Sequence, residues 1–163
     1  MSQTTLDIKE PGLNVLPPGV ERHVVNAGGL TGLQIFPDDE IEIINEEGNQ
    51  ICEIICFDKD GKSELGILNQ KENCKKSFIK ELLKGKDESS LITNLQLKKR
   101  NLDINKSKSS ILFDEQTPSG EKIKIKSKDK CYVIFAAPQN NMLVSEQNPS
   151  SDLTLFIKRN KIV

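Results

Sequence analysis

The sequence contains little of the side-chain chemistry on which most metal and redox sites depend. Among its 163 residues there is one histidine, His23, and the four cysteines include no pair at CxxC spacing. A site with two or three histidine ligands is therefore excluded. We expect the cysteines to be buried free thiols, and we predict no metal ion and no cofactor bound by this chain.

The chain also has few aromatic residues and almost no net charge. The chain has no tryptophan, one tyrosine and six phenylalanines, and its 23 basic and 24 acidic residues almost cancel. Nucleic-acid binding needs a basic surface or aromatic platforms for bases, so we expect no nucleic-acid partner. No apolar run approaches the roughly 20 residues of a membrane span, and the N-terminus lacks the pattern of a secretory signal. The sequence therefore predicts a cytoplasmic protein without a membrane partner.

The length of the chain and the absence of a marked change in composition along it indicate one domain preceded by a short arm. Residues 1–11 are polar and are predicted to form a flexible arm. No repeat or low-complexity linker divides the rest, so residues 12–163 are predicted to form a single β-rich domain.

What the chain has in abundance is short apolar runs bounded by turn-forming residues, which are typical of β-strands. The run at 122–126 alternates strictly, with Ile123 and Ile125 inward, whereas 131–137 is apolar on both faces. We predict that Ile43, Ile54, Val133, Ile134 and Leu155 share one core. The runs lie at residues 13–16, 20–25, 33–36, 41–44, 51–57, 63–68, 111–113, 122–126, 131–137 and 153–157.

Helical spacing interrupts these runs once, in the middle of the chain. Apolar residues recur every three or four positions between Cys74 and Leu83, and Asn69 with Glu72 has the spacing of a capping box. A second helix or turn over 89–97 is indicated by Leu91, Ile92 and Leu95. The predicted fold is mainly β, an antiparallel β-sandwich or barrel with one or two helices inserted around residues 70–97.

The stretch from Pro37 to Phe57 is the strongest pattern in the sequence. Its two apolar runs flank a segment with Gly48, which predicts a β-hairpin with a positive φ at that glycine. In the second run one face carries three apolar residues, and the other carries Glu53. The first face is Cys52, Ile54 and Cys56, and the second is Ile51, Glu53, Ile55 and Phe57.

Glu53 is therefore a carboxylate among apolar neighbours, and a buried charge needs a partner. It is either a functional residue or a structural carboxylate paired with Arg22, Arg159 or backbone amides. No catalytic residue is predicted, because nothing in the spacing places a thiol beside His23 and no serine lies in a GxSxG-like motif. The glycine-rich segment 27–32 lacks a full phosphate-binding pattern and is predicted to be a turn.

Two groups of residues together resemble a known family. The sequence VLPPG at residues 15–19, followed by an acidic turn and EGNQICE at residues 47–53, resembles the urea carboxylase-associated family. Downstream pieces resemble a narrower branch of it, the amino-terminal region of multidomain aminomethyltransferase-like proteins, which carry a glycine cleavage T-type folate module further on. These pieces are Leu112-Phe113, Ser119-Gly120-Glu121, Ala136-Ala137-Pro138, Asn148-Pro149 and Asp152-Leu153.

The resemblance implies a non-catalytic accessory domain or subunit of a folate-dependent, aminomethyltransferase-like enzyme of small-amine or amino-acid (one-carbon) metabolism. Its partner would be a glycine cleavage T-like folate-binding module or subunit, and tetrahydrofolate would bind to that partner or to a module absent from this chain. A small amine is the implied ligand. The implied ligand or interface residues are Gly48, Gln50 and Glu53, with Arg22 and His23 behind them.

The sequence also departs from that family. The cysteine-containing metal motif of its nitrogen-substrate enzymes is absent, and Glu53 stands where aspartate is common. Two alternatives therefore remain, a stand-alone enzyme of urea or guanidine-derivative breakdown (carboxyguanidine deiminase-like) and a purely structural interaction module.

Overall fold

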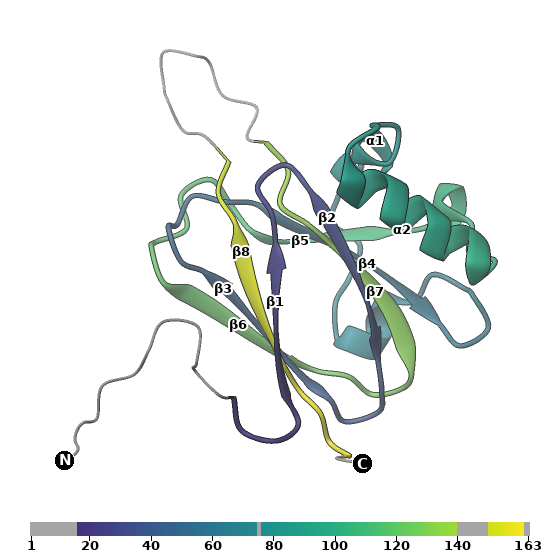
Figure 1. Cartoon of the computed structure of the whole chain (residues 1–163), viewed down its shortest axis with the longest axis horizontal. Coiled ribbons are helices and arrows are strands. Elements are labelled where there is room, and N and C mark those ends of the chain that lie inside the picture. The colour runs from purple at the N-terminus through teal and green to yellow at the C-terminus, as the bar shows by residue number, and fades with distance from the viewer. Residues whose placement is uncertain (1–15, 75, 140–149, 162–163) are drawn as a thin grey trace.

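The computed structural model describes residues 16–74, 76–139 and 150–161, and it shows two four-stranded antiparallel sheets packed face to face (Figure 1). The first sheet has the order β1 (Val20–Val25), β8 (Leu153–Lys158), β3 (Glu40–Asn45) and β6 (Glu121–Lys126). The second has the order β2 (Leu30–Ile35), β7 (Cys131–Ala136), β4 (Cys52–Asp58) and β5 (Ser109–Phe113). The predicted mainly β fold is confirmed as a sandwich. The arm at 1–11 and most of the strand expected at 13–16 lie outside the described residues.

The main core lies between the two sheets, and a second apolar layer lies outside the second sheet. The alternation predicted for β4 is confirmed, because Cys52, Ile54 and Cys56 pack in the main core while Ile55 and Phe57 pack in the outer layer. The predicted single core is wrong in one member. Successive strand residues point to opposite faces, so Ile134 lies in the outer layer while Val133 lies between the sheets.

The hairpin predicted from the stretch 37–57 is wrong. β3 pairs with β6 and β8, whereas β4 pairs with β5 and β7, so the residues between them cross from one sheet to the other. The physical reason lies in their outer faces. β3 keeps Glu40 and Glu42 partly exposed, whereas β4 is apolar on both sides and needs a sheet that is covered on both faces.

Helices supply that cover, as Figure 1 shows for α1 (Phe78–Leu82) and α2 (Glu88–Lys99). Ile79, Leu83 and Leu97 pack onto β4 and β7 in the outer layer. The two helices predicted around 70–97 are therefore confirmed, although the first is short and the second reaches residue 99. Among the described residues no helix is long and apolar enough to cross a membrane.

Two local predictions are wrong. The strand expected at 63–68 is instead the 3₁₀ helix η1 (Leu65–Leu68), preceded by a single bridge between Ser63 and Phe57. Asn69 ends η1 in the left-handed conformation at φ 57° and does not cap α1. The following residues stay extended because Asn73 hydrogen-bonds with the backbone of β5 at residues 109 and 111. A further 3₁₀ helix, η2 (Ile104–Lys106), leads into β5.

Candidate functional site

Glu53 is fully buried on the outer side of β4, and its carboxylate meets the start of α1. Oε1 accepts hydrogen bonds from the backbone amides of Phe78 at 2.7 Å and Ile79 at 3.0 Å. Oε2 accepts one from the Ser77 hydroxyl at 2.6 Å. Of the partners expected from the sequence, the structure therefore provides backbone amides rather than an arginine. Such amides at a helix start favour a negative charge.

Gly48 and Gln50 lie in the connection between β3 and β4, just before Glu53 in the chain. Gly48 has φ 78°, as predicted, and a Cβ there would lie 2.7 Å from the Ser119 nitrogen. The buried Gln50 side chain donates from Nε2 to the Pro138 carbonyl at 2.7 Å and accepts at Oε1 from the Ser151 amide at 2.8 Å. Gln50 thus holds both ends of the polar connection between β7 and β8, of which residues 140–149 lie outside the described part.

Arg22 and His23 lie in β1, in the other sheet. Arg22 is exposed, and His23 Nε2 lies 3.0 Å from a carboxylate oxygen of Glu21. Arg159 pairs with Glu21 and with Asp39, at 2.9 and 2.7 Å, and makes no hydrogen bond to Glu53. The structure therefore places Arg22 and His23 in one sheet and Glu53 in the other, and it does not bring the five residues selected from the sequence together in one site.

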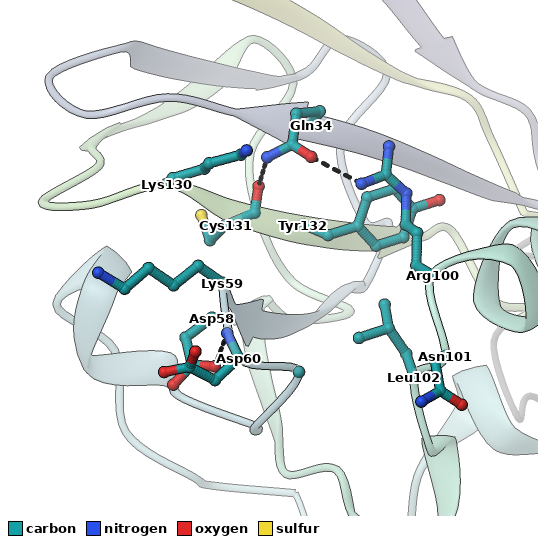
Figure 2. Close-up of a pocket in the computed structure, with 11 residues that line it drawn as sticks. Gln34, Asp58, Lys59, Asp60, Arg100, Asn101, Leu102, Lys130, Cys131 and Tyr132 are labelled. Atoms are coloured by element: carbon teal, nitrogen blue, oxygen red, sulfur yellow. Dashed lines mark hydrogen bonds between the residues drawn. The ribbon is translucent and has the colours of Figure 1, made fainter.

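A pocket elsewhere brings several charged side chains together. It has a volume of about 290 Å³ and lies between the start of β7, the turn after β4 and the C-terminal end of α2 (Figure 2). Gln34 of β2 orders one wall, since its Nε2 donates to the Cys131 carbonyl at 2.8 Å and its Oε1 accepts from Arg100 Nη1 at 2.6 Å. The Arg100 guanidinium lies over the Tyr132 ring, 4.3 Å from its centre.

Tyr132 is 5% exposed, and its hydroxyl has no hydrogen-bond partner among the described residues. Burial raises the pKa of this phenol, so it stays protonated at neutral pH. A side chain at Gly32 would overlap the hydroxyl, so only glycine leaves room for it. A buried hydroxyl that forms no hydrogen bond is costly, and this one faces the backbone of β2 at Gly32.

The charged groups of the pocket lie on different walls (Figure 2). Asp58 ends β4 and Asp60 lies in the turn that follows, where Asp58 Oδ1 accepts from two backbone amides at 2.9 Å each. Arg100 lies on the α2 side and Lys130 at the start of β7. The lining thus combines two carboxylates with three cationic side chains, those of Lys59, Arg100 and Lys130, which suits a ligand that carries both charges.

The pocket does not pair a nucleophile with a base. Its one thiol, Cys131, is buried, and its sulfur lies 3.5 Å from the Ser127 hydroxyl. Across residues 16–74, 76–139 and 150–161, no three side chains among His, Cys, Asp and Glu are grouped as metal ligands.

The sequence analysis did not select the residues of this pocket. Arg100 ends the basic run 98–100 of an exposed helix, and Tyr132 lies in an apolar strand, so neither stands out locally. Gly32 belongs to the glycine-rich segment that was predicted to be a turn, but it lies within β2. Gly32, Arg100 and Tyr132 come together only because α2 packs against β2 and β7.

Comparison with known proteins shows homology to a part of a much longer enzyme. No family model matches the sequence. The chain is 34% identical over 152 residues to trimethylamine-oxide aldolase of Ruegeria pomeroyi, an alignment that covers 93% of this chain and 19% of that protein. The chain therefore spans about a fifth of the length of this curated relative and is homologous to a part of it.

Proposed function

We propose that this chain is a non-catalytic accessory domain or subunit of an enzyme related to trimethylamine-oxide aldolase. The observation that carries the proposal is the alignment of nearly the whole chain with 19% of that protein. The geometry supports it, because the polar side chains of Glu53 and Gln50 are engaged within the fold and the pocket pairs no nucleophile with a base.

The remainder of such an enzyme would supply the chemistry. The resemblance to the amino-terminal region of aminomethyltransferase-like proteins assigns a glycine cleavage T-type folate module to that remainder, where tetrahydrofolate would bind. The carboxylates of Asp58 and Asp60 in the pocket suit a small amine or amino acid as the ligand of this chain.

A chimera tests the proposal. The aligned fifth of the Ruegeria pomeroyi enzyme is replaced by this chain, and trimethylamine-oxide consumption is compared among the parent enzyme, the chimera, a deletion lacking the aligned part, and the isolated chain. We expect the deletion to lose activity, the chimera to retain it, and the isolated chain to show none.

Each alternative gives a different result. Consumption by the isolated chain would contradict a non-catalytic role, and turnover of a urea or guanidine derivative by it would support a stand-alone enzyme. A fully active deletion, or a chimera that unfolds cooperatively but is inactive, would contradict membership in this enzyme and leave a structural interaction module.

A further inference from the structure

The outer face of α2 is apolar although it faces solvent. Leu91, Ile92 and Leu95 are 57%, 51% and 53% exposed, and they are three of the four large apolar side chains that are exposed in the described part of the chain. The opposite face of the helix buries the smaller polar residues Ser90 and Thr93 together with Leu97. The usual arrangement of an amphipathic surface helix is the reverse.

Specific contacts hold the helix in this orientation. Asp87 caps it by accepting a hydrogen bond from the Ser90 amide at 2.8 Å. The Ser90 hydroxyl donates to the Leu82 carbonyl at 2.6 Å, and Asn94 Nδ2 donates to the Leu83 carbonyl at 2.8 Å. Rotating α2 to bury its leucines would break these bonds, so the fold keeps the apolar face outward.

From this arrangement we infer that the outer face of α2, defined by Leu91, Ile92 and Leu95, is the docking surface for the remaining part of the aldolase-related enzyme. The inference rests on the proposed function. About four-fifths of the relative lies outside the aligned part, so under the proposed function a much larger remainder of the enzyme would adjoin this chain. An exposed cluster of large apolar side chains is the usual mark of such an interface.

The first sheet offers a less suitable surface. The outer side of β6 carries Lys122, Lys124 and Lys126, all exposed, and Lys124 faces Glu42 of β3 at 3.8 Å. Charged residues of this kind are depleted from interface cores. The α2 face is therefore the better candidate of the two.

The charges beside the α2 face specify the partner surface further. Lys98 and Lys99 follow in the last turn, both exposed, and neither forms a salt bridge with any residue that the structure describes. Arg100 comes next and lines the pocket. The partner surface should be apolar opposite the leucines and acidic opposite the helix end, and its docking would cover the α2 side of the pocket. Pockets at domain boundaries are common ligand sites.

The chimera described above tests this inference through site-specific cross-linking. A photoreactive amino acid replaces Leu95, and a matched control carries it at Lys124. We expect cross-links from position 95 to the remaining part of the enzyme and none from position 124. Absence of cross-links from position 95, or equal yields from both positions, would overturn the inference.

Substitutions beside the probe add a second measurement. The double substitution Leu91→Gln and Ile92→Gln should lower the cross-linking yield from position 95 by about tenfold, because a few central apolar residues dominate the binding energy of an interface. Lys122→Gln with Lys126→Gln should leave the yield unchanged. Because the α2 face is exposed, the first pair should not lower the melting temperature of the isolated chain. A large drop in that melting temperature would contradict the structural premise.

Two further outcomes separate the explanations. If the isolated chain self-associates in sedimentation experiments and Leu95→Gln abolishes this, the occupant is a second copy and the inference is wrong. An active chimera without cross-links from position 95 overturns the docking surface alone. An inactive but cooperatively folded chimera overturns the proposed function, whatever the cross-linking shows.

Discussion

The carboxylate of Glu53 in β4 accepts a 2.6 Å hydrogen bond from the Ser77 hydroxyl, and the same hydroxyl accepts one from the Lys80 amide at 3.2 Å. Ser77 therefore caps α1 and also links the helix to the second sheet through Glu53. The two amides bound by the other carboxylate oxygen complete the contact. The position of the short helix α1 thus depends on a charge buried in the second sheet.

Replacing Glu53 tests this contact. Glu53→Gln should lower the free energy of unfolding by about 1–3 kcal/mol, because the hydrogen bonds lose their charge and an amide proton is left without a partner. Ser77→Ala should cost about 0.5–2 kcal/mol. Urea unfolding of both single variants and the double variant should show a loss smaller than the sum. Strict additivity would contradict the contact.

Gly48 and Gly120 form a matched pair for a second prediction. Both have positive φ, 78° and 82°, but a Cβ at Gly48 would lie within 2.8 Å of the Ser119 nitrogen and the Thr117 carbonyl, whereas one at Gly120 meets nothing within 4 Å. Gly120→Ala should cost about 1–2 kcal/mol for its left-handed backbone. Gly48→Ala should cost at least about 1 kcal/mol more. Equal losses in thermal melts would show that the 46–51 and 117–120 segments do not pack as described.

The hydroxyl of Tyr132 gives a third prediction. Because this hydroxyl has no hydrogen-bond partner in the part of the chain that the structure describes, Tyr132→Phe should leave the free energy of unfolding unchanged or raise it. Gly32→Ala should lower it by about 1–3 kcal/mol through overlap with that ring. A stability loss above about 1 kcal/mol for Tyr132→Phe would mean that the hydroxyl is hydrogen-bonded in the folded protein.

Arg159 provides a pH-dependent prediction. Its hydrogen bond to Glu21 lowers the pKa of that carboxyl, so the folded chain binds the proton less tightly than the unfolded chain. The stabilisation is present above the ordinary value of 4.5 and is lost as the pH falls through the lowered pKa. Stability should therefore fall on acidification from pH 5 to about pH 3, and less so in Arg159→Met.

At neutral pH, Arg159→Met should lower the free energy of unfolding by about 2–3 kcal/mol, mainly because Asp39, 1% exposed, loses its ion partner. Lys124→Met is the control, since its 3.8 Å pair with Glu42 is largely exposed and should contribute under about 1 kcal/mol. Urea titrations at neutral pH measure the loss of stability, and titrations between pH 5 and about pH 3 measure the acid dependence. An unchanged acid slope in Arg159→Met would contradict the link to Glu21.

The sequence by itself determined most of the strand segments, with the run 63–68 and the start of β2 as exceptions, and which faces of those strands are apolar. Period-two alternation is local, so it assigned Ile54 and Glu53 to opposite sides of β4 and placed Ile123 and Ile125 inward on β6. It also indicated the buried Glu53, the positive φ of Gly48 and the helices of the middle segment. These features depend on residues close together in the chain.

Only the tertiary structure decided which strands pair and which side chains meet. Strands β3 and β4 are neighbours in sequence, yet each needs a different outer environment, and this need separates them into two sheets. Asn69 had the spacing of a cap for α1, but the pairing of Asn73 with β5 moved the helix start to Ser77. The pocket joins Gln34, Arg100 and Tyr132, which are 66 and 32 residues apart in the chain. No local pattern encodes such a contact, because it results from how the packed layers are positioned.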